Sequence, residues 1–578
     1  MLRPGSLSWV PMTTNDVDVL VVGGGPTGLA LALELRRHGL RARIVDQSEG
    51  PSIWSKAQAI HARTLELLER AGVAQELLRD GKRIRQVNVF GAGGRRVAQL
   101  AIEGLDTAYP YIYSLPQRNT EIVLAGCVER AGGAVEHKVR LEGFTQDERG
   151  VDARLVHADG REEAVHAAYM VGCDGAHSTV RHALGLAFAG SSYEVRIIQA
   201  DVHVELPFPI EDDEAALFFG EGAVVGLLPL PGKHRYRLLA PRPPGDEMEA
   251  TLENFQQIFA AVGPAGAVVD DPAWMIAFRL HCRMVERYRV GRVFLAGDAA
   301  HIHSPAGGQG MNMGIQDAFN LAWKLALVHH GRARPELLDS YHAERHPVAA
   351  ATLAGTDTAT SGIAFNLSLH SPIALELRNR LIGFATSLGF VRRKVSRTAS
   401  MLDVHYANSP IVAQDRPSLL GAHLFGERRD ERPFVRDWFH FGHGPVPGDR
   451  APDVLDPEIE DSPRLFASLD PRRHTLLLFD GASASEAGYQ GFVALAERLE
   501  ARFPGLVAVR VVVPHDERPA VLAAWPGQVL LDAEGRVHER YGARSECLYL
   551  VRPDGYVGYR CQPADPDKLI GYLERIFV

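Results

Sequence analysis

A glycine-rich turn between a buried strand and a compact helix constrains this chain more than any other feature. An apolar run over residues 18–22 leads into Gly23-Gly24-Gly25-Pro26-Thr27-Gly28, and the pattern predicts a helix over residues 29–35. A second predicted strand over residues 41–45 ends at Asp46. This order of strand, turn, helix, strand and acidic residue is the fingerprint of a Rossmann-type dinucleotide-binding fold.

Each residue of the fingerprint has a physical role. Gly23 permits the tight turn, Gly25 lets the backbone approach a pyrophosphate, and Gly28 lets the helix pack closely on the strand. Asp46 can accept a hydrogen bond from a ribose 2′-hydroxyl, which disfavours a 2′-phosphate and therefore NADP at this position. The fingerprint fits both NAD and FAD.

The segment from Gly291 to Asn312 predicts a second ligand contact. A short apolar strand stops at Gly297-Asp298, a glycine-rich loop follows, and an apolar helix is expected to begin near Asn312. The loop would bring unpaired backbone N–H groups and a helix N-terminus to one place, which suits a flat polar group that can carry negative charge. One dinucleotide fold plus this loop favours a long cofactor held at both ends, and FAD fits that description.

A third motif indicates a family. The predicted strand over residues 168–172 leads into Cys173-Asp174-Gly175 and continues to Arg181. With all three motifs in order between residues 16 and 347, the chain resembles the single-component FAD-dependent aromatic hydroxylases, the class A flavoprotein monooxygenases of the phenol hydroxylase type. The resemblance implies that FAD, NADPH or NADH as a transient co-substrate, and O2 together hydroxylate a phenolic or polycyclic aromatic substrate through a flavin C4a-hydroperoxide.

The resemblance also implies roles for individual residues. Gln117 would contact the flavin chain, and Asp298 would hold the ribityl chain. Asp174 and Arg181 match a segment linked to both FAD and NADPH, whereas Lys56 stands where the family often has arginine and would meet phosphate as a point charge. The predicted cofactor-binding residues are Gly23, Gly25, Pro26, Thr27, Gly28, Asp46, Gln47, Lys56, Gln117, Asp174, Arg181, Gly297, Asp298, Pro305, Gly308, Gly310, Met311 and Asn312.

The helix expected after Asn312 should place its positive N-terminal end at the part of the flavin ring that becomes anionic on reduction. Its apolar positions recur at helical spacing and predict one buried face, with Lys324 off that face. The positions on the predicted buried face are Ile315, Ala318, Leu321, Ala322 and Leu325.

Residues 189–275 read as short strands separated by turns, which predicts an antiparallel β-sheet inserted into the nucleotide-binding domain. We expect its inner face to cover an aromatic pocket. Candidate substrate contacts are Phe218, Leu228, Arg279 and Pro305. For the apolar strand residues an ordinary core position is the alternative, and for Arg279 a solvated strand face. No catalytic side chain is predicted.

The predicted fold class is therefore α/β with several domains. A discontinuous FAD-binding domain spans residues 16–188 and 276–400, a disordered extension precedes it at 1–15, and a linker covers 401–444. Residues 445–578 resemble a thioredoxin-like α/β domain. Since the five cysteines are scattered and form no C-x-x-C motif, a structural or dimerisation role is favoured over dithiol chemistry.

Composition excludes several functions. The chain has 62 basic and 71 acidic residues, a net charge of −9 and no long basic run, which argues against nucleic-acid binding. No apolar run approaches the ~18 residues of a membrane span, so we expect a cytoplasmic protein, with a homodimer possible. His301 and His303 have no further ligand cluster near them in sequence, and no metal is predicted.

Other activities remain open at this level. A Baeyer–Villiger or epoxidising oxygenase acting on a polyketide would use the same flavin fold. A non-oxygenating FAD dehydrogenase would too, because the cofactor carries the chemistry in each case.

Overall fold

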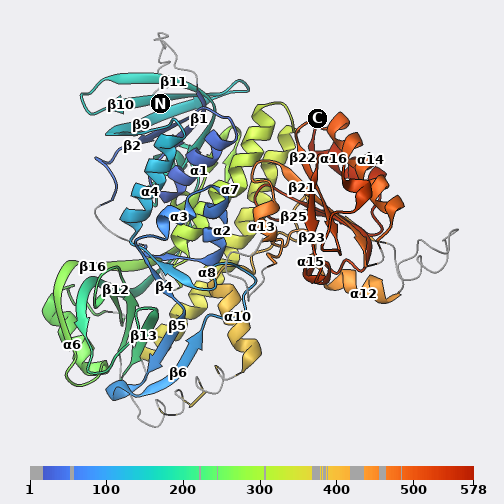
Figure 1. Ribbon diagram of the computed structural model, residues 1–578. Helices are drawn as coiled ribbons and strands as arrows, with labels where there is room; N and C mark the ends of the chain where they lie inside the picture. Colours follow the sequence, from blue (N-terminus) through green and yellow to red (C-terminus); the bar gives the residue numbers. More distant parts are fainter. Residues whose placement is uncertain are drawn as a thin grey trace.

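The computed structural model describes residues 17–52, 57–220, 223–243, 245–304, 307–367, 376, 378, 380–381, 386, 388–416, 435–454, 464–482 and 484–578. Within these residues the strands form three large sheets and one small sheet of β3 (Ala59–Ile60), β7 (Ile112–Ser114) and β4 (Lys82–Ile84). In Figure 1 the first large sheet lies at the top left, the second at the lower left and the third on the right. The predicted N-terminal extension, Lys56 and Pro305 lie outside the described residues.

The first sheet has the Rossmann arrangement that the fingerprint predicts. Its central strand β1 runs parallel to β2 and β11, and the order continues outward through β8 on one side and β18 on the other. The elements are β1 (Val17–Val22), α1 (Pro26–Arg37), β2 (Ala42–Asp46), α4 (Gln117–Arg130), β8 (Val135–His137), β9 (Val139–Gln146), β10 (Val151–His157), β11 (Glu162–Gly172), β17 (Arg289–Val290), β18 (Val293–Leu295) and α7 (Gly310–His329).

The second sheet is wider than the predicted segment 189–275. Strands β5 and β6 join it from earlier in the chain, and β5 pairs in parallel with β13, so the sheet is not purely antiparallel. Its order is β19-β16-β12-β15-β14-β13-β5-β6. The strands are β5 (Gln86–Phe90), β6 (Arg96–Ala101), β12 (Ala189–Glu205), β13 (Glu214–Phe219), β14 (Val224–Pro229), β15 (Arg235–Arg242), β16 (Val268–Met284) and β19 (His301–Ile302), with helix α6 (Leu252–Val262) packed against them.

The third sheet forms the C-terminal domain. Strands β21, β22 and β23 are parallel to one another, whereas β24 runs antiparallel to both of its neighbours, β21 and β25. Strand β20, from the predicted linker, completes one edge beside β25, and the thioredoxin-like assignment stays a prediction. The elements are β20 (Ala413–Asp415), β21 (His474–Gly481), α14 (Glu486–Arg502), β22 (Val507–Val513), β23 (Gln528–Leu531), α15 (Arg536–Tyr541), β24 (Ser545–Val551), β25 (Val557–Cys561) and α16 (Pro566–Ile576).

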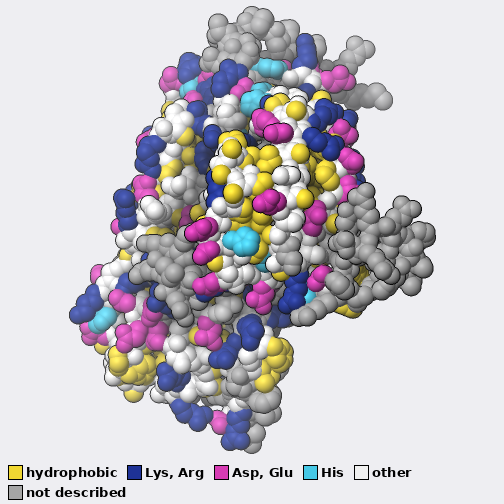
Figure 2. Space-filling model, turned by 45° about the vertical axis from the view of Figure 1, so that its right-hand side comes forward, with side chains coloured by type: hydrophobic (Ala, Val, Ile, Leu, Met, Phe, Trp, Pro, Cys, Tyr) yellow, Lys and Arg dark blue, Asp and Glu magenta, His cyan; other side chains and the backbone are white. Residues whose placement is uncertain are grey.

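Further helices connect these sheets. They are α2 (Ala62–Arg70), α3 (Ala74–Leu77), α5 (Thr179–Ala183), α8 (Asp339–Leu367), α10 (Gly389–Ala399), α12 (Val435–His443) and α13 (Leu465–Ser468). No helix among the described residues has the length and apolar character to span a bilayer. Figure 2 shows basic and acidic side chains interspersed over one face of the molecule, around a band of apolar side chains.

The burial of α7 corrects one expectation. Lys324 is not on an exposed face: its side chain is fully buried, and its Nζ lies 2.7 Å from Glu344 Oε2 and 2.8 Å from Asn320 Oδ1. Helix α7 is covered on both sides, because Trp323 packs into the core of the C-terminal domain while Leu321 packs into that of the FAD-binding domain. A helix enclosed on all sides buries its charged residue as well.

Candidate active site

The three sequence motifs converge on one point around Thr27. Gly23 has φ +112°, and a Cβ there would lie 2.3 Å from the Cys173 carbonyl oxygen. A Cβ at Gly297 would lie 2.6 Å from Thr27 Oγ1, and one at Gly314 only 2.2 Å from it. Only glycine fits these approaches, so the nucleotide turn, the Asp174 segment, the Asp298 turn and the start of α7 form one contiguous surface.

The N-terminus of α1 is arranged to hold an anion. Gly25 is the N-cap residue without a side-chain hydrogen bond, no acidic residue occupies the first turn, and the space where its Cβ would be is open. The free N–H groups and the helix dipole therefore face an open position, which fits a pyrophosphate. At the end of β2, the Asp46 carboxylate accepts hydrogen bonds from the Gly24 and Ser48 N–H groups, which hold it beside this turn. Gln47 is exposed next to it.

Asp298 is an exposed carboxylate on a buried turn. It lies in the short helix η2 (Gly297–Ala299), whose other residues are buried. The buried side chain of Asp317 stabilises the turn: its Oδ2 accepts hydrogen bonds from the Gly297 N–H at 3.0 Å and from His301 Nε2 at 2.8 Å. A solvent-facing carboxylate fixed in this way fits a polyol such as a ribityl chain.

A buried ion pair supports the same turn. Arg345 Nε donates to Asp317 Oδ1 at 2.6 Å, and its Nη2 donates to the Met313 carbonyl of α7 at 3.2 Å. Burial alone would raise the pKa of Asp317, but the charges of Arg345 and His301 outweigh it and keep the pKa below its usual value. The turn therefore rests on a permanent negative charge.

The Asp174 segment lies between the nucleotide turn and the Asp298 turn. Arg181 is buried and points inward, donating to the carbonyls of Ala176 at 2.9 Å and Ala299 at 3.4 Å. Burial raises the pKa of the Asp174 carboxyl, whose Oδ1 is buried with no partner among the described residues. An orphaned acceptor beside the Gly23 turn is consistent with a missing donor from a nucleotide.

The glycine loop before α7 is held by His61, which sequence reasoning missed. His61 Nε2 lies 2.9 Å from the Gly307 carbonyl and 3.1 Å from that of Gly308. Because carbonyls only accept, Nε2 carries the proton, and burial lowers the pKa of His61 to about 4. The only sequence signal is a histidine before α2, which says nothing about a loop more than 240 residues away.

Asn312 serves this loop through its side chain. Its Oδ1 accepts from the His61 N–H at 2.9 Å, and its Nδ2 donates to the carbonyls of Ala59 and Gly308. Of the predicted contacts at the helix start, Gly310 is the first residue of α7 and Met311 is partly buried. The N-cap residue Gln309 makes no side-chain capping bond and the first turn lacks acidic residues, so the positive helix end is free to face a ligand.

Gln117 lies at the start of α4, but its side-chain amide is bound within the protein. Its Oε1 accepts from the Ala57 N–H at 3.1 Å, and its Nε2 donates to Glu121 at 2.8 Å. Its predicted flavin contact stays a prediction.

The substrate candidates are placed differently from what we expected. Phe218 is fully buried in the core of the second sheet and stacks on Phe90 at 4.9 Å, which corrects the prediction of a pocket-lining ring. Arg279 is exposed and pairs with Glu247 at 3.2 Å, on a solvated strand face. Leu228 is partly buried on β14.

A cavity of about 860 Å³ opens beside the glycine loop instead. Its wall begins at Gly307 and Gln309 and continues along α8, α10 and the segment 401–409, with no residue of the second sheet in its lining. The apolar part of the wall includes Val348, Ala351, Phe390, Val391, Val395 and Met401. This volume falls in the range of small-molecule sites, about 300–1,000 Å³.

Known proteins match both the sequence and this geometry. A family model described as FAD binding domain matches residues 16–356. The 6-methylpretetramide 4-monooxygenase of Streptomyces rimosus is 32% identical over 98% of this chain and 95% of its own length. The pentachlorophenol 4-monooxygenase of Sphingobium chlorophenolicum is 33% identical over 98% of both chains. Among solved structures, the OxyS anhydrotetracycline hydroxylase from Streptomyces rimosus has a TM-score of 0.68 at 29% identity, over 97% of this chain and 99% of that one.

The chain therefore belongs to the FAD binding domain family. Within that family it is an FAD-dependent monooxygenase, with NAD(P)H as the reductant typical of the class, which confirms the predicted cofactor and enzyme class. The uncapped N-terminus of α1 and the open space at Gly25 fit the pyrophosphate of FAD. The uncapped N-terminus of α7 fits the flavin ring, and the exposed Asp298 carboxylate fits the ribityl chain.

Proposed function

We propose that this monooxygenase hydroxylates a phenolic ring of a polycyclic aromatic substrate, bound in the cavity beside the glycine loop. The observation that carries the proposal is the cavity itself: its wall is mostly apolar, its volume is about 860 Å³, and it shares Gly307 and Gln309 with the loop that precedes α7. Relatives named for anhydrotetracycline and 6-methylpretetramide support a multi-ring substrate, and one named for pentachlorophenol supports a phenol.

FAD, when bound, supplies electron transfer from NAD(P)H and activation of O2. The chain itself positions the cofactor and the substrate. The N-terminus of α7 presents unpaired N–H donors, and His61 and Asn312 fix the loop against which the ring would lie. The apolar part of the wall would cover one side of the substrate and reduce its contact with water, which strengthens the electrostatic effect of these dipoles.

The test combines isotope labelling with a cavity-filling variant. FAD-loaded protein is given NADPH, 18O2 and phenols of one to four rings, and products are read by mass spectrometry. A multi-ring phenol that gains one 18O atom and accelerates NADPH oxidation supports the proposal. An oxygen inserted into a ring C–C bond, or NADPH oxidation without oxygen incorporation, contradicts hydroxylation.

Val348→Trp then tests the location. Val348 lines the cavity, whereas Ala350, two residues further along α8, is exposed and points to another side of the helix. We expect V348W to lower kcat/KM for a multi-ring phenol by about tenfold or more, the loss of ~1.4 kcal/mol of binding, and to affect a single-ring phenol less. A350W is the matched control and should have the kcat/KM of the wild type. Equal losses of kcat/KM in both variants would show that the substrate does not bind in this cavity.

A homodimer and a cytoplasmic location stay predictions. Sedimentation of the purified protein would measure the first directly.

A further inference from the structure

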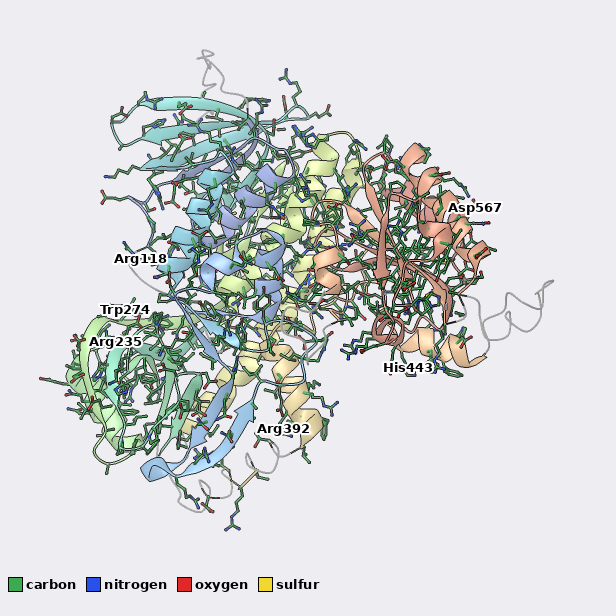
Figure 3. The ribbon with its side chains drawn as sticks, viewed as in Figure 1. Arg118, Arg235, Trp274, Arg392, His443 and Asp567 are labelled. Atoms are coloured by element: carbon green, nitrogen blue, oxygen red, sulfur yellow. The ribbon has the colours of Figure 1, made fainter. Side chains whose placement is uncertain are left out.

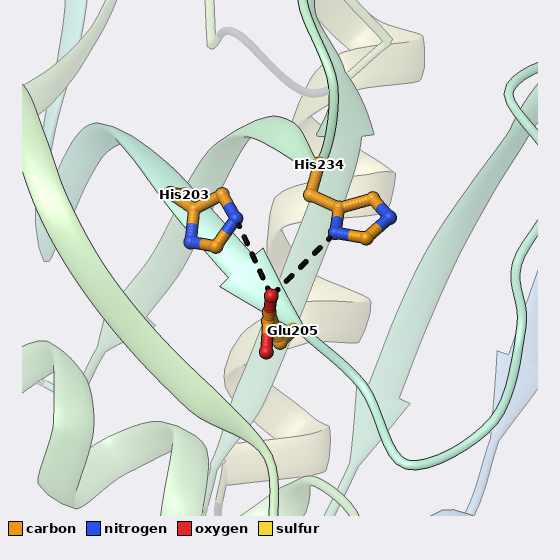
Figure 4. A group of neighbouring side chains, drawn as sticks. All are labelled: His203, Glu205 and His234. Carbon is orange, nitrogen blue, oxygen red and sulfur yellow. Dashed lines mark ion pairs between the residues drawn. The ribbon is translucent and has the colours of Figure 1, made fainter.

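Two histidines and a glutamate from separate parts of the second sheet converge away from the cofactor site (Figure 4). His203 and Glu205 are two residues apart on β12 and so share one face, and His234 comes from the turn between β14 and β15. Their ligating atoms all lie within 4.8 Å of one another. His203 Nε2 and His234 Nδ1 each lie 3.9 Å from Glu205 Oε1.

The ring of His203 is already oriented for coordination. Its Nδ1 lies 2.7 Å from Asp270 Oδ1, on the neighbouring strand β16. Because an ionised carboxylate only accepts, Nδ1 donates to Asp270, and Nε2, on the side of Glu205, is the ring nitrogen left to bind a metal ion. Histidine ligands of metal ions characteristically donate their other N–H group to a carboxylate in this way.

The backbone brings His234 over the same strand. Its φ is +53°, in the left-handed region that a histidine adopts at a cost, and Gly232 before it has φ +109°. The Val204 N–H donates to the His234 carbonyl at 2.9 Å, so the turn is tied to β12 between the two other ligands. The two imidazole ring centroids are 5.8 Å apart.

The local charge favours a cation. Glu205, Asp270 and Asp271 contribute three carboxylates, and Arg235 is paired with Asp271 at 2.7 Å. Lys233, the residue before His234, is exposed. A bound cation would therefore meet net negative charge.

We propose that His203, Glu205 and His234 bind a Zn²⁺ ion, with water as the fourth ligand. Two imidazoles and a carboxylate suit zinc, whose ~2.0–2.1 Å bonds place tetrahedral ligand atoms about 3.3 Å apart. The 3.9 Å separations close by side-chain rotation, since the Glu205 and His234 side chains are 61% and 44% exposed.

The ion would be structural. The site is on the outer flank of the second sheet, where Arg235 and Trp274 are labelled in Figure 3, on the side away from the C-terminal domain. The turn that carries His234 follows Pro229, whose carbonyl accepts from Gln58 Nε2 at 3.0 Å and from Ser114 Oγ at 2.5 Å. Zinc would therefore fix the strand end that joins the second sheet to the FAD-binding domain.

The experiment measures zinc retention by the full-length, FAD-loaded protein without an affinity tag. The protein is stripped with a chelator and dialysed against micromolar Zn²⁺, and bound zinc is measured by atomic emission. The wild-type protein should retain one more equivalent of zinc per chain than the His203→Ala or Glu205→Gln variant. The midpoint of its thermal unfolding should be higher with zinc than without it. Asp270→Asn should weaken zinc affinity about 10–100-fold, as expected for loss of a carboxylate that orients a ligand.

His166→Ala is the matched control. His166 Nδ1 also lies 2.7 Å from a carboxylate, that of Asp152, yet it belongs to no group of three ligands among the described residues. It should retain the wild-type equivalent, and X-ray absorption should show two imidazole nitrogens on the bound zinc. Equal zinc content in wild type and H203A, or a loss in H166A as large as in H203A, would overturn the proposal. Unchanged FAD content in each variant shows that it has folded.

Discussion

Replacement of Asp317 by asparagine tests how the fold positions the Asp298 turn. Asp317 is fully buried, accepts the Gly297 N–H at 3.0 Å, and pairs with Arg345 at 2.6 Å. Asparagine has the same shape but no charge, so the buried guanidinium of Arg345 loses its counterion. Breaking a buried pair in this way costs about 3–5 kcal/mol of stability.

The effect on the cofactor should be smaller and separable. If the amide no longer holds the Gly297 N–H, the turn loses one hydrogen bond of about 1 kcal/mol, which weakens FAD binding about fivefold. Urea unfolding gives the first quantity, and recovery of flavin fluorescence on dilution of the loaded protein gives the second.

Asp201→Asn is the matched control. Asp201 pairs with Arg237 at 2.7 Å in the second sheet, also buried, and accepts from Trp274 Nε1 at 2.7 Å. It should lose comparable stability while retaining wild-type FAD affinity. If D317N binds FAD as tightly as wild type, or if both variants lose FAD equally, the Asp317 hydrogen bond does not position the turn.

The pH dependence follows from the same pair. The pKa of Asp317 in the folded protein is below its ordinary value, so its contribution is present above the unfolded pKa of about 3.9 and is lost as the pH falls through the folded pKa. The stability difference between wild type and D317N should therefore be constant near neutrality and narrow below about pH 4.

Three further predictions concern the cofactor site and acid stability. Asp298→Ala should lower the flavin content of the purified protein, because it removes the exposed carboxylate of the turn; unchanged absorbance at the flavin band would refute this contact. Gly308→Val should do the same, since φ is +64° and its Cβ would meet Ala59 Cβ at 2.9 Å, whereas Gly491→Ala, in open space, should have no effect. Burial lowers the pKa of His474 to about 3, so its neutral ring stabilises the fold above about pH 6.5 and loses this contribution as the pH falls. His474→Phe should make the melting temperature less sensitive to pH between about 6.5 and 3, and an unchanged slope would contradict it.

The nucleotide-binding half could be predicted because its signals are local. A Cβ at Gly28 would lie 2.0 Å from the Gly23 carbonyl oxygen, so this glycine is required by a contact within one strand, turn and helix, and the local spacing identifies the fold. The pairing of β5 with β13 brings together residues more than 120 positions apart, and nothing in either strand specifies its partner. The prediction for the second sheet therefore covered only residues 189–275 and left out β5 and β6.

The interior of the site was harder to predict for a related reason. Alternation along β13 indicates two faces but not which one meets a pocket, and Phe218 proved to be on the core side. His61 acts on a loop distant in sequence, and Lys324 is buried because a second domain covers its helix. Such roles depend on how distant segments pack against each other, and the periodicity of one segment carries no information about its packing partners.

Helix α7 links the cofactor site to the C-terminal domain and suggests why that domain is attached. Its N-terminus faces the candidate cofactor site, and its other half carries Lys324, whose side chain is fully buried. Burial lowers the pKa of Lys324 to about 8, opposed by the charge of Glu344. The C-terminal domain completes this group: Arg552 donates to Glu344 at 2.5 Å, and Asp554 accepts from Asn320 at 3.4 Å and from Trp323 at 3.3 Å.

A buried lysine persists only where its charge is paired and its neighbours are satisfied. Here Arg552 and Asp554, in the turn after β24, complete the buried group of charges around Glu344, and the charge of Asp554 favours the protonated lysine. The domain that supplies them has no C-x-x-C motif. The contacts thus favour a structural role for the C-terminal domain: it closes the interior around α7, the same helix whose first turn faces the candidate flavin site.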